Sequence, residues 1–147
     1  MVKFIGEYTV KVDDKGRLIL PSSFKSVISN EDFRFVVKKD LYSNCLEMFT
    51  YEEWAKESEK VKSRLNFFNR EHNQFWREYM RDRAIVEPDE KLGRISIPRR
   101  LLEQIGVERE VVFAGNDYKI EIWAKENFQN TKLPESDYLT LAEKILG

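Results

Sequence analysis

The chain contains the same short motif twice, and this duplication restricts its possible folds more than any other feature. Residues 13–21 read Asp-Asp-Lys-Gly-Arg-Leu-Ile-Leu-Pro, and residues 90–98 read Glu-Lys-Leu-Gly-Arg-Ile-Ser-Ile-Pro. Aligning the two Gly-Arg pairs gives an offset of 77 residues (94 − 17). In a chain of 147 residues, such a repeat predicts two copies of one supersecondary unit. Copies that pack about a pseudo-twofold axis would bring both Gly-Arg turns to one face.

Side chains alternate in both copies, which predicts a short strand with one buried face. The matching positions are Leu18 and Leu20 with Ile95 and Ile97 on one side, and Arg17 and Ile19 with Arg94 and Ser96 on the other. Because only the first side is apolar in both copies, we expect it to face the core. Both arginines are then predicted to lie on the outer face, at the mouth of the turn.

The repeat extends well beyond the motif. Pro21 and Pro98 stop the predicted strands and suit the start of a short helix. Further strand-like runs follow at 33–37 and 46–49 in the first half, and at 111–113 and 120–123 in the second. Each half then enters a helix near 51 or 125, and Thr50 and Glu53 have the spacing of a capping box.

These elements predict an α+β, mainly β fold, in which two halves within one chain are related by a pseudo-twofold axis. We divide the chain into a first repeat at 1–54, a helical connection at 55–83, a second repeat at 84–128 and a C-terminal tail or helix at 129–147.

The helical connection is unusually rich in aromatic residues. The stretch 51–83 has few helix breakers and predicts one or two helices, with a break near Asn66 or Asn69. Two interpretations of the aromatic residues stay open. They pack over the chain's own barrel, or some of them contact a neighbouring protomer. Apolar residues at 139–146 suggest a short terminal helix or a flexible tail.

Composition excludes several classes of function. One cysteine, Cys45, and one histidine, His72, rule out an internal disulfide and make Cys/His catalysis or a metal cluster within one chain unfavourable. We expect neither a cofactor nor a small-molecule substrate. No apolar run approaches the roughly 20 residues of a membrane span, and the first ten residues do not resemble a signal peptide. We therefore expect a cytoplasmic protein without membrane contact.

The net charge of −1 argues against binding nucleic acid through bulk charge. Local patches around the two motifs are basic, however, with a net charge of +1 over 11–17 and +2 over 88–100. Such small patches predict weak DNA binding by one protomer, so useful affinity requires several copies acting together.

The chemistry of the turns suits DNA recognition. Arginine can bond guanine O6 and N7 with its planar fork, which is worth about 1–3 kcal/mol of discrimination. We expect Asp13 and Glu90 to accept backbone N–H bonds and orient the turns.

Simpler interpretations apply to the same residues. One Asp-x-x-Gly-Arg copy alone would more readily be a hairpin turn with a solvated ion pair, and Arg99 and Arg100 could be polar residues in the first turn of a helix. Acid/base catalysis by the loop carboxylates is disfavoured, because adjacent basic residues keep them ionised. Two motifs in register favour binding over these interpretations.

The paired acid-x-x-Gly-Arg-apolar-Pro motifs resemble those of the MraZ family of bacterial transcription regulators and, more broadly, the AbrB/MazE-like swapped-hairpin barrels. Three further features are similar to that family: the opening at 4–8, the Glu-Glu-Trp run at 52–54 that leads into a helical stretch, and the Ile-Glu-Ile-Trp run at 120–123. The resemblance covers residues 4–128.

This resemblance implies a duplicated AbrB/MazE-like β-barrel with peripheral helices, assembled into a ring-like homo-oligomer. It implies a regulator that binds short repeats in double-stranded promoter DNA of the division and cell-wall gene cluster, and that is associated with the nucleoid. The Gly-Arg loops, carried onto 15–17 and 91–94, would contact the DNA. The candidate DNA-binding residues are then Lys15, Gly16, Arg17, Lys91, Gly93, Arg94, Arg99 and Arg100. The second loop departs from the first, with Glu90 opposite Asp13 and Leu92 opposite Lys15. The alternative function is an antitoxin-like protein-interaction module that uses the tail at 129–147.

Overall fold

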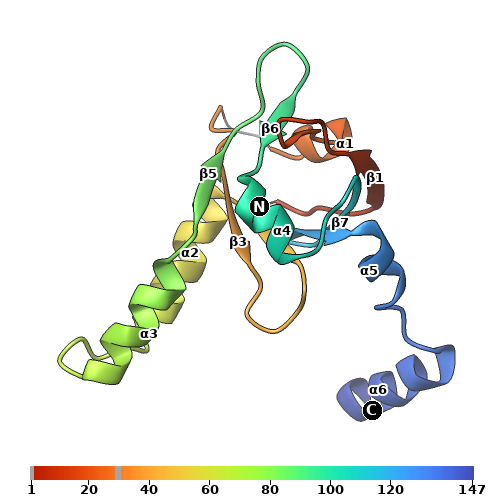
Figure 1. Cartoon of the computed structure of the whole chain (residues 1–147). Helices are drawn as coiled ribbons and strands as arrows, with labels where there is room; N and C mark the ends of the chain where they lie inside the picture. The colour runs from red at the N-terminus through yellow and green to blue at the C-terminus, as the bar shows by residue number, and fades with distance from the viewer. Residues whose placement is uncertain (1, 29–30) are drawn as a thin grey trace.

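The two halves of the chain exchange strands to build a shared core (Figure 1). The computed structural model describes residues 2–28 and 31–147. The strands are β1 (Glu7–Lys11), β2 (Arg17–Ile19), β3 (Phe35–Lys39), β4 (Leu46–Thr50), β5 (Ala84–Val86), β6 (Arg94–Ser96), β7 (Glu110–Asn116) and β8 (Lys119–Ala124). The helices are α1 (Ser22–Lys25), α2 (Tyr51–Lys62), α3 (Arg70–Met80), α4 (Arg99–Gln104), α5 (Lys125–Gln129) and α6 (Glu135–Leu146).

The larger sheet is symmetric in its strand order, β1-β7-β8-β4-β3-β5. Strand β1 of the first half pairs with β7 of the second, and β5 of the second half pairs with β3 of the first. The hairpins β3–β4 and β7–β8 meet at the central β4–β8 pair. A pseudo-twofold axis therefore runs between β4 and β8, and neither half forms a complete sheet from its own strands.

The motif strands β2 and β6 form a second, two-stranded antiparallel sheet. Leu18 pairs with Ile95 at its centre, and both side chains are fully buried. Leu20 and Ile97 are buried as well, whereas Ile19 is 54% exposed. The predicted orientation of both strands is thus confirmed.

The core lies between the two sheets and is built mainly from strand residues. Its largest fully buried side chains come from both halves and from the N-terminal segment; they include Phe4, Phe24, Phe35, Leu46, Met48, Phe113, Ile120 and Leu101. The predicted α+β fold with a barrel-like β core and peripheral helices is confirmed.

Helices α2 and α3 form a hairpin that projects from the barrel (Figure 1). Thr50 Oγ1 accepts the Glu53 N–H at 3.2 Å, which caps α2 as its spacing predicts. The chain leaves the helix at 63–69, and Asn69 caps α3 by accepting the N–H groups of Glu71 and His72. The connection is therefore two helices, broken in the predicted region.

The chain ends in α6, which stands apart from the barrel on the side opposite the α2–α3 hairpin (Figure 1). None of the residues of α6, Glu135–Leu146, is buried. Among residues 2–28 and 31–147, no helix has both the length and the apolar character needed to cross a lipid bilayer.

Candidate functional site

The pairing of β2 with β6 brings the two Gly-Arg turns to the ends of one short ladder. The Gly16 carbonyl accepts the Ile97 N–H at 3.2 Å, and the Gly93 carbonyl accepts the Leu20 N–H at 2.9 Å. Arg17 lies opposite Ser96 in register, and Arg94 lies opposite Ile19. The two arginines therefore occupy diagonal positions on the outer face of one sheet, a placement that keeps long side chains within reach of each other.

Asp13 fixes the first turn through both of its carboxylate oxygens. Oδ1 accepts the backbone N–H groups of Lys15 at 2.9 Å and Arg17 at 2.8 Å, and Oδ2 accepts Arg17 Nε at 2.7 Å. These bonds, led by the Arg17 backbone N–H, lower the pKa of Asp13. The carboxylate thus holds both the backbone and the arginine side chain.

Asp89 fixes the second turn in the same way, so the prediction that Glu90 orients this turn is wrong. Asp89 Oδ1 accepts the N–H groups of Leu92 at 2.8 Å and Gly93 at 3.0 Å, and Oδ2 accepts Arg94 Nε at 2.8 Å. The Leu92 N–H, followed by the Arg94 side chain, lowers the pKa of Asp89 to about 2. Glu90 is exposed at the tip of this turn.

The two turns differ in length. The acidic residue lies four positions before the arginine in the first turn and five before it in the second. The second turn is therefore one residue longer, and it rises as the uppermost part of the molecule between β5 and β6 (Figure 1). A fixed offset of 77 residues cannot register such an insertion.

Both arginine side chains are partly exposed to solvent. Their side chains are 32% exposed at Arg17 and 25% exposed at Arg94. Asp13 and Asp89 bind Nε, and within the described part of the chain the Nη atoms of both arginines have no hydrogen-bond partner. Each arginine is therefore fixed at its base and keeps its terminal donors for a ligand.

The two motif glycines have different surroundings. Gly16 has φ of +78° and is buried, and a Cβ there would lie 3.1 Å from the Ile97 carbonyl oxygen. Gly93 has φ of +69°, and a Cβ would meet no described atom within 4 Å. Both turns need the left-handed conformation that glycine adopts readily. Only the first also needs glycine for close packing.

The remaining predicted residues surround these turns at different distances. Lys15 and Lys91 are exposed at the turn tips, and their ammonium groups have no ion-pair partner among residues 2–28 and 31–147. Arg99 donates from Nη2 to the Asp14 carbonyl at 2.8 Å, which draws α4 to the first turn. Arg100 instead pairs with Asp82 at 3.3 Å, away from both turns.

Sequence reasoning missed Arg109, which lies in a hollow of about 330 Å³ behind the first turn. The hollow is lined by Val12, Asp13, Asp14, Gly16, Arg99, Leu102, Glu103, Val107, Glu108 and Arg109. Four carboxylates face two arginines there, so the hollow does not suit an anion. The Arg109 carbonyl accepts the Val12 N–H at 2.8 Å. Because these two residues are far apart in sequence, no local motif predicts that Arg109 lies beside the first turn.

Other titratable groups do not form a reactive site. Burial raises the pKa of Cys45 to about 12, so its thiol stays protonated and unreactive. Within the described residues, no group of three or more His, Cys, Asp or Glu side chains could hold a metal ion. The turn carboxylates are bound to arginine and backbone N–H groups, an arrangement that serves positioning rather than proton transfer.

The fold and the paired turns define a class of protein: a duplicated barrel whose two strand-exchanged halves present Gly-Arg turns on one surface. Comparison with known proteins identifies the family. The family model described as "MraZ protein, putative antitoxin-like" matches residues 3–78 and 82–135. The chain is 33% identical over 148 residues to the transcriptional regulator MraZ of Bacteroides thetaiotaomicron, covering 100% of this chain and 94% of the relative.

Two further relatives agree. The transcriptional regulator MraZ of Christiangramia forsetii is 36% identical over 150 residues, covering 100% of this chain and 95% of the relative. That of Clostridium botulinum is 35% identical over 142 residues, with 97% and 96% covered. The chain belongs to the MraZ family. This membership supports a role in transcription regulation and separates the chain from enzymes.

Proposed function

We propose that this protein binds short repeats in double-stranded promoter DNA through its paired Gly-Arg turns. The observation that supports this function is the placement of Arg17 and Arg94 on one outer face, each held at Nε by an aspartate. An arginine fixed in advance loses little conformational entropy when its terminal donors bond a base edge. The class of protein to which its relatives belong agrees with this chemistry.

In this proposal the arginines read bases and the lysines bind phosphate. Arg17 and Arg94 bond guanine through their Nη atoms, while Lys15 and Lys91 hold the backbone at the turn tips. Gly93 lets the second turn approach the groove. The buried Gly16 acts differently from the sequence prediction, because it positions Arg17 without touching DNA.

Arg99 and Arg100 take supporting roles. Arg99 keeps donors for a phosphate beside the first turn while one Nη holds the Asp14 carbonyl. Arg100 must leave its pair with Asp82 to reach DNA. Both partners of that pair are about half exposed, at 57% and 46%, so separating them costs little.

Affinity depends on several protomers acting together. The net charges of +1 at 11–17 and +2 at 88–100 neutralise few phosphates, so one protomer binds weakly. A ring-like homo-oligomer on repeated sites raises the effective concentration of each turn. The promoter of the division and cell-wall gene cluster is the proposed target, and a cytoplasmic, nucleoid-associated location follows from it.

Binding to promoter DNA with direct repeats tests the proposal. We expect Arg17→Ala and Arg94→Ala each to weaken specific binding by about 1–3 kcal/mol per protomer. Arg64→Ala is the matched control. Arg64 is exposed in the segment between α2 and α3, so its substitution removes the same charge far from the turns. Unchanged affinity in both turn variants, or an equal loss in the control, contradicts the proposed site.

A further inference from the structure

Helix α6 has an apolar side without a partner. Its apolar residues are Tyr138, Leu139, Leu141, Ala142, Ile145 and Leu146. At 100° per residue they share one side of the helix, and the polar Thr140, Glu143 and Lys144 lie on the other. Ile145 is 74% exposed and Leu146 is 85% exposed. An isolated helix of this length is marginal in water, so α6 requires a surface on which to pack.

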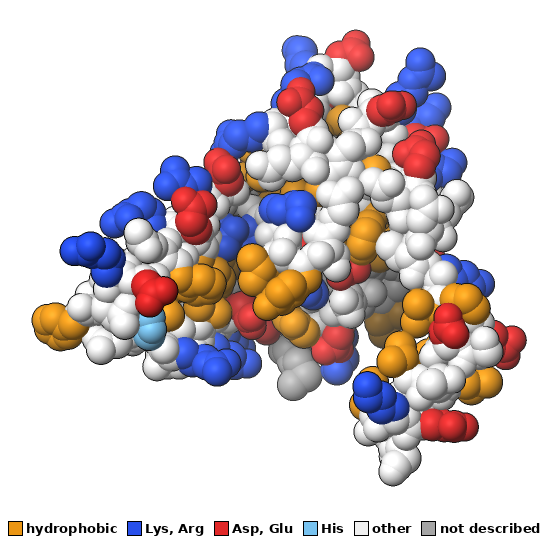
Figure 2. Space-filling view, turned by 60° about the horizontal axis from the view of Figure 1, so that its bottom comes forward, with side chains coloured by type: hydrophobic (Ala, Val, Ile, Leu, Met, Phe, Trp, Pro, Cys, Tyr) orange, Lys and Arg blue, Asp and Glu red, His pale blue; other side chains and the backbone are white. Residues whose placement is uncertain are grey.

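Helix α3 offers a surface of matching character. A hollow of about 520 Å³ along it is lined by Asn73, Trp76, Arg77, Met80 and Arg81. Aromatic rings pack against its wall: the Trp76 ring stacks on Tyr79, with centroids 5.2 Å apart, and meets the Phe67 ring at 6.0 Å. Apolar side chains gather along the α2–α3 hairpin and on α6 (Figure 2).

The charges of the two surfaces are complementary. Arg77 and Arg81 line the hollow; Arg81 also pairs with Glu78 at 3.1 Å, whereas Arg77 has no ion-pair partner among the described residues. Helix α6 carries Glu135, Asp137 and Glu143 against Lys144, a net charge of −2. Opposite charges at the rim of an apolar contact favour one orientation and suppress wrong partners.

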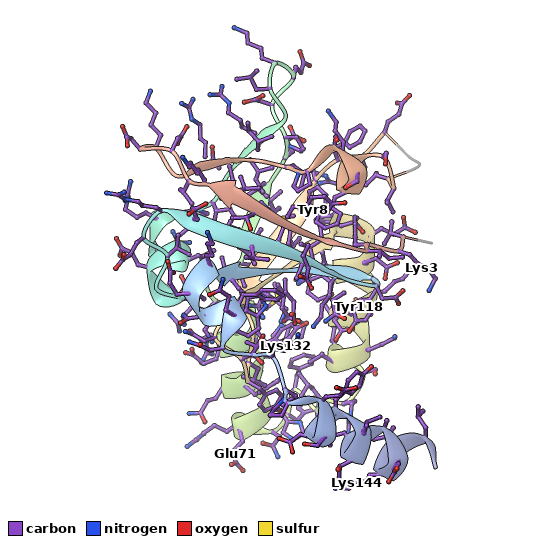
Figure 3. The ribbon with its side chains drawn as sticks, turned by 90° about the vertical axis from the view of Figure 1, so that its right-hand side faces the viewer. Lys3, Tyr8, Glu71, Tyr118, Lys132 and Lys144 are labelled. Atoms are coloured by element: carbon purple, nitrogen blue, oxygen red, sulfur yellow. The ribbon has the colours of Figure 1, made fainter. Side chains whose placement is uncertain are left out.

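The geometry points to a second copy of this chain as the occupant of the hollow. The two surfaces lie at the same end of the molecule, as Lys144 of α6 and Glu71 of α3 show (Figure 3). They nevertheless lie on opposite sides of it (Figure 1). Only residues 130–134 link α5 to α6, so the facing ends of these two helices can lie at most about 22 Å apart, six Cα–Cα steps of about 3.6 Å each.

We infer that α6 of one protomer docks its apolar side into the α3 hollow of the next. Such a contact joins two different surfaces, so each copy can bind one neighbour with α6 and another with α3. Repetition of this contact closes into a ring or continues as a filament. The Gly-Arg turns at the other end of the molecule remain accessible. The inference supplies an interface for the self-association in the proposed function and rests on that part of it.

The test measures the mass of the full-length chain in solution by light scattering over a dilution series. Wild type is expected to form assemblies larger than the 17.6 kDa chain. Ile145→Glu on α6 and Met80→Glu in the hollow should each lower the mass to that of one chain. Thr140→Glu and Gln74→Glu place the same charge on the polar side of α6 and outside the hollow, and should leave the assembly intact.

Mixing the two defective variants gives the decisive result. Ile145→Glu retains the hollow and Met80→Glu retains α6, so an equimolar mixture should form a dimer with twice the mass of the chain and grow no further. A mixture that stays monomeric overturns the inference, as does a monomeric wild type, which would indicate docking within one chain or on another protein. If Ile145→Glu still assembles and binds promoter repeats, this interface is wrong and the proposed function stands.

Discussion

At the scale of single residues, Asp13 and Asp89 organise the two Gly-Arg turns. Each carboxylate binds the backbone N–H groups of its turn with one oxygen and the Nε of its arginine with the other. Charge-assisted bonds of this kind are shorter and stronger than neutral ones. The arginines are thereby positioned before any ligand arrives.

The depressed pKa of Asp89 gives a direct test of this bonding. Its value falls from an ordinary 3.8 to about 2, first through the Leu92 N–H and then through the Arg94 side chain. Because the folded pKa is the lower one, its contribution to stability is complete above pH 3.8 and disappears as the pH falls through about 2. The carboxyl ¹³C shift of Asp89 should therefore titrate near pH 2. In Arg94→Ala the midpoint should rise but stay below 3.8, since the backbone donors remain; a wild-type midpoint at 3.8 contradicts this account.

The two glycines should respond differently to alanine. Both positions have positive φ, which costs an alanine about 1–2 kcal/mol. At Gly16 the added Cβ also lies 3.1 Å from the backbone carbonyl oxygen of Ile97, a residue whose own N–H is bonded to the Gly16 carbonyl. Urea unfolding should therefore show Gly16→Ala to be less stable than Gly93→Ala. Equal losses would mean that the first turn shifts freely.

At the scale of elements, the sequence predicted the strands well because each has one buried face. Alternation alone places Leu18 and Ile95 inside, and both are fully buried. The same reasoning wrongly predicted that Glu90 orients the second turn. An alignment at constant spacing ignores the extra residue in that turn, so it overlooks Asp89, which accepts the N–H groups of the turn. The burial of Gly16 was likewise unpredictable, since it depends on the approach of Ile97, which follows β6 and lies 81 residues further along the chain (97 − 16).

A buried group of charges across three strands is a second element-scale feature. The carboxylate of Glu47 in β4 forms an ion pair with Lys38 of β3 at 2.8 Å. It forms a second ion pair with Lys119 of β8, which belongs to the other half. Lys38 and Glu47 are both buried. The two lysines depend on one carboxylate, because an unpaired charge in such surroundings is strongly unfavourable.

Glu47→Gln should consequently destabilise the fold by about 3–5 kcal/mol in urea unfolding, because it leaves two ammonium groups without their carboxylate. Lys119→Gln is the comparison, and should cost clearly less since Glu47 keeps its bond to Lys38. A Glu47→Gln variant as stable as wild type would show that the lysines find other partners.

At the scale of the whole molecule, strand exchange makes the two halves one folding unit. Strand β1 has its ladder only with β7, and β5 only with β3, among the described residues. Either half alone would expose an apolar sheet face and lose an edge strand. The sequence showed the duplication, but not which strands cross, because pairing between halves leaves no local signal. Helices α3 and α6 lie outside this folding unit, and neither helix has a buried residue.

Cooperative unfolding of the halves follows from the exchange. Trp54 lies in α2 of the first half, Trp123 in β8 of the second, and Trp76 in the projecting α3. With 5-fluorotryptophan incorporated, ¹⁹F NMR in urea follows all three within one sample, at one protein concentration. The Trp54 and Trp123 resonances should lose intensity at the same urea concentration, since neither half keeps a sheet without the other. The Trp76 resonance should lose intensity at or below that urea concentration. Local opening of a helix with few buried contacts requires less free energy than global unfolding. Separate midpoints for Trp54 and Trp123 would show two independent domains and contradict the shared core.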